Sequence, residues 1–142
     1  MRVGWVTHQL PDGSMTRGAG LLQGRYAGGA EMSTEEMLAA APDDVEVTVL
    51  RPDGPPSSLD GFDRVVVGAT EQLSAPLTAA LRASEPILWL RSPQPATLRP
   101  LFEAARLVVW PSRTCAEWHP WWQGPYELCP APMDPDCVFP AE

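Results

Sequence analysis

The stretch at residues 63–91, DRVVVGATEQLSAPLTAALRASEPILWLR, decides the fold of this chain. It begins and ends with short continuous apolar runs, which are typical of strands covered on both faces. Between these runs, Ser74 and Pro76 mark the start of a helix over 75–83, because Ser caps helices and Pro is favoured in the first helical turn. The stretch therefore predicts a strand, a crossover helix and a second, parallel strand.

The same alternation continues on both sides of this unit. Six apolar runs are expected to be strands, at 2–7, 45–50, 63–69, 86–91, 106–112 and 126–132. Helices are expected at 30–41, 75–83, 97–105 and 114–122, and the last of these opens with a Thr114-x-x-Glu117 capping box. Strands that alternate with helices indicate βαβ units. We therefore expect residues 1–142 to form a single α/β, Rossmann-like three-layer domain with about six mostly parallel strands.

Composition excludes several classes of function. The formal net charge is −8, which argues against nucleic-acid binding, because that requires clustered Lys and Arg. Cys115, Cys129 and Cys137 show no C-x-x-C spacing and no neighbouring pair of histidines, so neither a metal site nor a disulfide framework is indicated. No apolar run is long enough for a signal peptide or a membrane span, and we expect a cytoplasmic protein.

Two adjacent glycines, Gly28 and Gly29, precede the apolar pattern of the first expected helix. A helix beginning there would direct unpaired backbone N–H groups toward the carboxyl edge of the sheet, where parallel α/β folds bind ligands, and would favour an anion. Gly28, Gly29 and Ala30 are therefore candidates for binding a donor phosphate. Ser33 with Glu36 offers a second helix start, and in that case the glycines form only a flexible turn.

Polar residues at the ends of other expected strands complete the candidate site. His8 is the one catalytic candidate, for orienting an acceptor hydroxyl or relaying a proton; the alternative is a structural imidazole bonded to the backbone. Arg91 and Ser92 follow the fourth strand, where Arg91 is suited either to gripping a phosphate or to a surface ion pair. Ser112 and Arg113 follow the fifth strand, and Ser112 is interpreted either as a helix cap or as a ligand contact.

The six tryptophans fall into two groups. Trp5, Trp89 and Trp110 lie within expected strands, and we expect them in the core because large rings bury well there. The run WHPWW at 118–122 is interrupted by Pro120, so its rings cannot all face one core through a helical pattern. Three explanations stay open for it: irregular core packing, a partner interface or stacking against carbohydrate.

Taken in order, the motifs resemble the N-terminal domain of GT-B glycosyltransferases, and most of all the retaining family 4 group. The motifs are RVGWVTHQL, GGAE at 28–31, VEVTVL, FDRVVVGAT, PILWLRS, RLVVWPSRT and PAPMDPDCVFP. The resemblance implies that the Gly-Gly pair lies beside the phosphates of the donor and that a Ser follows the strand at 106–112. Glu31, beside the pair, is a candidate for stabilising the helix end or for contacting a sugar hydroxyl.

The resemblance implies the acceptor-side half of a site for glycosyl transfer from a UDP- or GDP-sugar, with no tightly bound cofactor. The family's second domain holds most nucleotide-sugar contacts and has no counterpart in these 142 residues. We therefore expect the isolated chain to be inactive or nearly so, and to work with a separate C-terminal domain or a second copy.

Two other functions remain as alternatives. The first is a non-catalytic binding or regulatory module on the same scaffold, since a fold does not fix a function. The second is a nucleotide-dependent oxidoreductase. It rests on the run GAGLLQG at 18–24, which is one residue off the G-x-G-x-x-G pattern and does not directly follow a strand.

Overall fold

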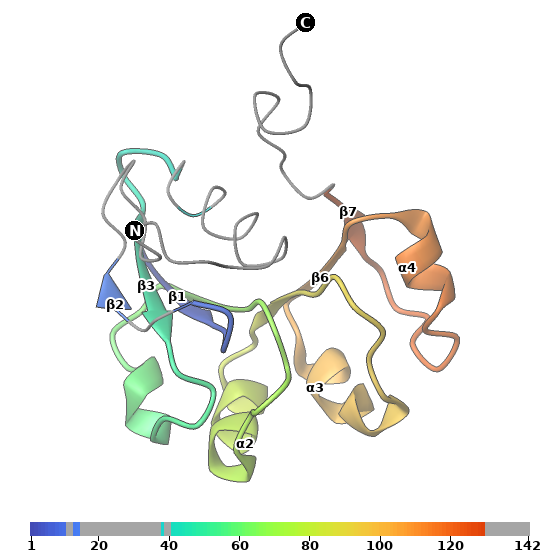
Figure 1. Cartoon of the computed structure of the whole chain (residues 1–142), viewed down its shortest axis with the longest axis horizontal. Helices are drawn as coiled ribbons and strands as arrows, with labels where there is room; N and C mark the ends of the chain where they lie inside the picture. Colours follow the sequence, from blue (N-terminus) through green and yellow to red (C-terminus); the bar gives the residue numbers. More distant parts are fainter. Residues whose placement is uncertain (11–12, 15–37, 39–40, 130–142) are drawn as a thin grey trace, which may run out of the picture.

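One seven-stranded sheet runs through the computed structural model, which describes residues 1–10, 13–14, 38 and 41–129 (Figure 1). The six expected strands are β1 (Arg2–Val6), β3 (Glu46–Leu50), β4 (Arg64–Val67), β5 (Ile87–Trp89), β6 (Leu107–Trp110) and β7 (Glu127–Leu128). They are parallel and lie in the order β3-β1-β4-β5-β6-β7. A two-residue strand, β2 (Gly13–Ser14), pairs antiparallel with β3 at the edge. The expected α/β class and the mostly parallel, Rossmann-like sheet are confirmed.

Helices connect the parallel strands. They are α2 (Ala75–Ala83), α3 (Arg99–Ala104) and α4 (Arg113–Glu117), with the 3-10 helices η1 (Pro56–Leu59) and η2 (Ala96–Leu98). Each α-helix joins two neighbouring parallel strands, as in a βαβ unit (Figure 1). Of the helix expected at 30–41, only residues 38 and 41 are described: Leu38 is helical and buried, whereas Ala41 is not helical.

Apolar side chains cover both faces of the sheet. Val65 and Val67 of β4 pack on the face that carries the α-helices, and Val66 packs on the other face, because successive side chains of a strand alternate. The cluster on the helical face contains Val6, Val65, Val67, Leu77, Leu81, Leu88, Leu90, Leu101, Phe102, Val108, Trp110 and Cys115. The opposite cluster contains Trp5, Leu10, Leu38, Val47, Val49 and Val66. Burial on both faces explains why the strands read as continuous apolar runs.

Helix α2 has the bounds that the sequence predicts. The Ser74 hydroxyl oxygen accepts a hydrogen bond from the Leu77 N–H at 3.3 Å, and Pro76 lies in the first turn. Leu77 and Leu81, one helical turn apart, are its buried residues. The cap therefore fixes where the helix begins, and the spacing of the two leucines fixes which side faces the sheet.

Helix α4 differs from its prediction. The Thr114-x-x-Glu117 capping box is wrong: Ser112 is the cap, and its hydroxyl oxygen accepts the Cys115 N–H at 3.2 Å. The alternative interpretation of Ser112 as a helix cap is thereby confirmed. The helix ends at Glu117 rather than at residue 122, and Pro120, which lacks a backbone N–H, lies in the turn that follows.

Replacing the two possible caps separately tests this assignment. We expect Ser112→Ala to lower the free energy of unfolding by about 0.5–2 kcal/mol, because the Cys115 N–H loses its partner. Thr114→Ala is the matched control and should change it by less than about 0.5 kcal/mol. Urea unfolding followed by circular dichroism measures both, and a larger effect at Thr114 would restore the capping box.

Trp5 of β1 is in close contact with Gly68, which directly follows the neighbouring strand β4. A Cβ placed on Gly68 would stand 2.2 Å from Trp5 Nε1. The indole is buried and packs near Trp89, with 5.7 Å between ring centroids, so it has little room to move aside. Gly68 is therefore needed for the close approach of this ring to the end of β4.

We expect Gly68→Ala to destabilise the fold by roughly 1–3 kcal/mol, the usual cost of overpacking a core. Gly54→Ala is the control, because the nearest atom to its added Cβ is the side-chain oxygen of half-buried Ser58 at 3.3 Å, a milder contact than 2.2 Å. Urea midpoints of the two variants should differ clearly. Equal midpoints would show that the indole moves freely.

Candidate functional site

The strand order reverses beside β1. The chain passes from β1 to β3 on one side and then to β4 on the other, so β1 and β4 flank a topological switch point. In open parallel sheets, ligands bind outside the carboxyl ends of the strands at such a point. Seven polar residues gather there, and we call them the carboxyl-edge cluster. They are Thr7, His8 and Gln9 after β1, Thr70 and Glu71 after β4, and Ser92 and Gln94 after β5.

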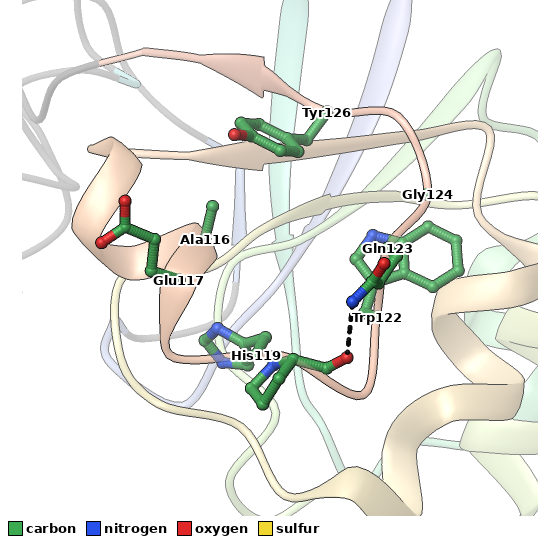
Figure 2. A pocket seen from close by; sticks show the side chains of 8 residues that line it. Ala116, Glu117, His119, Trp122, Gln123, Gly124 and Tyr126 are labelled. Atoms are coloured by element: carbon green, nitrogen blue, oxygen red, sulfur yellow. Dashed lines mark hydrogen bonds between the residues drawn. The ribbon is translucent and has the colours of Figure 1, made fainter.

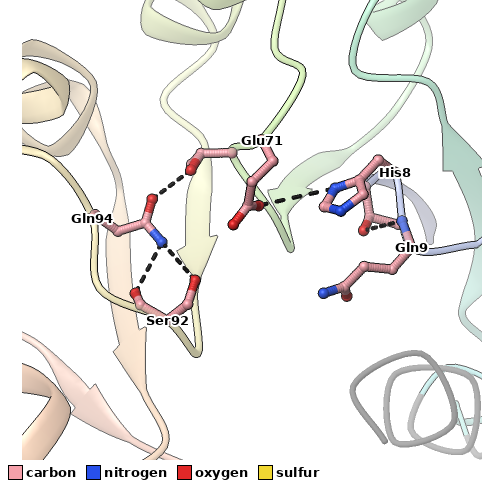
Figure 3. A network of polar contacts seen from close by, with 7 residues as sticks. His8, Gln9, Glu71, Ser92 and Gln94 are labelled. Carbon is pink, nitrogen blue, oxygen red and sulfur yellow. Dashed lines mark hydrogen bonds and ion pairs between the residues drawn. The ribbon is translucent and has the colours of Figure 1, made fainter. Parts of the chain in front are cut away.

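His8 and Glu71 meet across the switch point. His8 Nδ1 lies 3.9 Å from Glu71 Oε2, and the side chains are 27% and 54% exposed. Figure 3 shows Glu71 between His8 on one side and Gln94 on the other. The Thr7 hydroxyl oxygen accepts the Gln9 N–H at 3.1 Å and so holds the turn behind His8. Among the described residues, the imidazole therefore has a carboxylate neighbour, and the choice between a catalytic and a structural role for His8 stays a prediction.

The turn that presents Glu71 is conformationally unusual. Gln72 has φ 69°, in the left-handed region that residues other than glycine seldom adopt. The Leu73 N–H donates to the Thr70 carbonyl at 3.3 Å and closes the turn. Backbone strain of this kind is often found at functional sites, and here it lies next to the carboxylate that faces His8.

Gln94 fixes the loop that follows β5. Its Nε2 donates to the Ser92 carbonyl at 2.9 Å and to the Ser92 hydroxyl at 3.2 Å (Figure 3). Its Oε1 accepts the Thr70 hydroxyl, and its backbone N–H donates to His119 Nε2 at 2.8 Å. The residue is buried, and its side chain joins the loops after β4 and β5 into one rigid edge.

His119 is a structural histidine. Because Nε2 accepts the Gln94 N–H, the proton must lie on Nδ1, which donates to the Cys115 carbonyl at 2.6 Å. The ring is buried and stacks on Trp110 with 4.3 Å between centroids. Both nitrogens are thus engaged within the protein, and the neutral tautomer is defined by its neighbours.

The rings of the run at 118–122 divide between core and surface. Phe102 contacts the rings of His119, Trp121 and Trp122, with centroid distances of 6.5, 4.9 and 5.7 Å. Trp118 is 53% exposed. Irregular core packing is therefore confirmed for the rings on Phe102, and Trp118 is left for another explanation.

Two of the three tryptophans that were expected in the core are buried there. Trp5 and Trp110 are buried, whereas Trp89 is half-buried. Trp5 Nε1 is buried and has no hydrogen-bond partner in the part of the chain that the structure describes. Since Trp5 lies against Gly68 at the end of β4, a buried donor lies close to the switch point.

The structure places some of the predicted site residues and not others. Gly28, Gly29, Ala30 and Glu31 lie outside the described residues, so the phosphate site stays a prediction. Arg91 is half-buried in the loop beside Ser92. Ser112 and Arg113 lie at the start of α4, where the Ser112 hydroxyl serves as the cap and Arg113 is exposed. His8 and Ser92 therefore come to the same edge.

Sequence reasoning missed Glu71 and Gln94. Both follow strands that were predicted, but each meets its partner through the fold, across 63 residues for His8 and Glu71 and 24 for Thr70 and Gln94. The position of Glu71 after a strand was the signal that could have identified it. Gln94 stands between Pro93 and Pro95 and reads as an ordinary turn residue.

A second charged pair lies at the carboxyl end of β3. Arg51 Nε is 3.0 Å from Asp53 Oδ1, and the guanidinium holds the pKa of Asp53 below its usual range, chiefly by its hydrogen bond. Both side chains are more than half exposed, so the pair contributes little to stability. This end of the sheet presents a cation that already has an acidic partner.

Within residues 1–10, 13–14, 38 and 41–129, no three His, Cys, Asp or Glu residues lie together as metal ligands would, and no helix has the length and apolarity to cross a membrane. Comparisons with protein-family models, curated proteins and solved structures gave no match to this chain. The fold and the carboxyl-edge cluster therefore carry the functional argument.

The structural role of His119 can be measured against the other histidine. We expect His119→Phe to keep a stacked ring but to leave the buried Gln94 N–H unpaired, at roughly 1–3 kcal/mol. The Cys115 carbonyl loses one donor but keeps the Trp118 N–H at 3.3 Å. His8→Phe makes the same chemical change at a more exposed site and should stay within about 0.5 kcal/mol of the parent. The free energy of urea unfolding reports both, and similar losses would contradict the assignment.

Proposed function

We propose that this chain is the acceptor-side half of a site for glycosyl transfer from a sugar nucleotide, with the acceptor bound at the carboxyl-edge cluster. The observation that carries the proposal is the pairing of His8 with Glu71 across the switch point. Its support is threefold: the parallel fold, the position at the carboxyl ends of the strands, and the resemblance of the motif order to GT-B enzymes.

The pair is suited to receiving a proton. His8 Nδ1 faces Glu71, so Nε2 is the nitrogen that would meet the acceptor hydroxyl. The hydroxyl oxygen forms a bond to the anomeric carbon and gives its proton to Nε2, while the bond from that carbon to the donor phosphate breaks and the nucleoside diphosphate leaves with the electron pair. Glu71 then stabilises the imidazolium, as carboxylates do in other His-dependent sites.

Stabilising the diphosphate requires more donors than Arg51 and the predicted glycine site supply. Arg51 is paired with Asp53, and the predicted phosphate contacts at Gly28, Gly29 and Ala30 form only one side of such a site. Loss of one preorganised donor typically costs about 100- to 1000-fold in rate. The proposal therefore requires a second domain, supplied by a partner chain or by a second copy.

One observation favours the alternative of a non-catalytic binding module. The polar atoms of Gln94, the nitrogens of His119 and the hydroxyl of Ser112 are engaged in hydrogen bonds within the protein. Much of the polarity of this edge thus serves the fold. A scaffold of this kind presents a rigid edge to a partner without performing chemistry.

Reconstitution tests the catalytic proposal. The chain is mixed with C-terminal donor-binding domains of GT-B enzymes, UDP- or GDP-sugars and a panel of sugar acceptors, and diphosphate release and sugar transfer are measured. We expect no turnover from the chain alone. In an active mixture, His8→Ala should lower kcat by about 100- to 10,000-fold, the usual contribution of general base catalysis, and Glu71→Gln should lower it less.

The matched control is Glu85→Gln, which removes another exposed carboxylate from a pair, 3.6 Å from Arg106. It should leave kcat unchanged. Transfer that is insensitive to His8 would reject the assigned role, and a failure of every mixture to bind or to turn over would favour the binding module.

A further inference from the structure

We propose that a second site, between α4 and the loop that leads into β7, binds a single neutral sugar ring. We call it the α4–β7 pocket. Its volume is about 320 Å³, at the lower end of the range for ligand sites, so it suits one small ring and not a whole nucleotide. The carboxyl-edge cluster does not line it, and this inference does not depend on the proposed function.

Aromatic surface gathers around this pocket. Tyr126 and Trp122 line it, and Tyr126 is 40% exposed (Figure 2). Of the four large apolar side chains that are exposed in the described part of the chain, three lie within residues 118–128: Trp118, Tyr126 and Leu128. Of these three, Tyr126 lines the pocket itself. A flat apolar ring face is the natural partner of an exposed aromatic ring.

The polar groups of the pocket call for a ligand that both donates and accepts hydrogen bonds. Glu117 supplies a carboxylate, which accepts. Trp122 Nε1 is a buried donor with no partner among the described residues, and a buried donor left unpaired costs about 1–3 kcal/mol. A hydroxyl group can donate to the carboxylate and, once a shift of the side chains exposes Nε1, accept from the indole. An ammonium group only donates, and a fully ionised phosphate group only accepts.

Charge points the same way. Among the described residues that line the pocket, Glu117 is the one Asp, Glu or Arg residue, and both nitrogens of His119 are engaged with Gln94 and Cys115. A phosphate or carboxylate would meet a like charge with no cation to offset it. The chemistry that remains is a neutral ring with several hydroxyls and one apolar face, which describes a hexopyranose.

Ligand binding in this pocket requires the side chains of Gln123 and Trp122 to move. Gln123 holds the Pro120 carbonyl by a long hydrogen bond of 3.4 Å (Figure 2), which is weak enough to give up when a ligand enters. The Trp122 indole lies directly on Gly124, where a Cβ would stand 2.2 Å from the ring. Because the N–H is not open to solvent, a small shift of these side chains has to accompany binding.

An NMR titration tests the inference on the full chain. The ¹⁵N-labelled protein is titrated with D-glucose, D-galactose and D-mannose, and the signals of the tryptophan indole N–H groups are followed. We expect one indole signal to shift with at least one of these sugars. Its absence from the spectrum of Trp122→Phe should assign it to Trp122.

Variants separate stacking from polar recognition. Tyr126→Ala should weaken sugar binding at least tenfold. Tyr126→Phe, which keeps the ring, should bind the sugar as the parent protein does. Glu117→Gln should weaken binding, and Glu103→Gln, an exposed carboxylate on α3 outside the pocket, should not. These surface changes are expected to leave the unfolding midpoint nearly unchanged.

Three results would overturn the inference. They are the absence of an indole shift with all three sugars at tens of millimolar, an equal response to methylammonium or inorganic phosphate, and binding that survives Tyr126→Ala unchanged. None of them bears on the pairing of His8 with Glu71, so failure here is distinguishable from failure of the transfer proposal.

Discussion

The hydrogen bond from the Gln94 N–H to His119 Nε2 joins the carboxyl-edge cluster to the α4–β7 pocket. On one side, Gln94 holds Thr70 and Ser92 and so fixes the carboxyl edge. On the other, His119 stacks on Trp110 and lines the α4–β7 pocket. The bond is buried at both ends, where an unmade hydrogen bond is costly. The geometry of the candidate site thus depends on a hydrogen bond between two residues that are 25 positions apart in the sequence. Neither residue is assigned a catalytic role.

Most of the fold follows from local rules. The apolar runs became strands because the sheet buries both faces, and Ser74 with Pro76 gave α2 its observed start. The exceptions are cases where local signals compete or are absent. Ser112 and Thr114 both suit a helix cap, and only the end of β6 at Trp110 decides between them. Strand β2 has two residues and no apolar pattern that could reveal it.

The site was less accessible from sequence than the fold. His8, Arg91, Ser92, Ser112 and Arg113 all follow parallel strands and so lie at the carboxyl edge. Their roles in ligand binding stay predictions. The partners Glu71 and Gln94 were missed, because contacts between loops depend on which strands are neighbours. The predicted glycine site at residues 28–30 is outside the described residues and keeps the standing of a prediction. The candidate site is therefore defined by contacts between loops, which no single sequence motif specifies.

The central place of β1 has a consequence during translation. Its neighbours are residues 46–50 and 64–67, so on the ribosome the first strand waits for most of the next sixty or so residues before both of its edges are paired. From β5 onward, each strand pairs with the one made just before it. In a chain of this topology, the first apolar strand stays unpaired longer than the later strands do during synthesis. Here that strand includes Trp5 and Val6. A nascent chain stalled before residue 64 would be the form most in need of a chaperone.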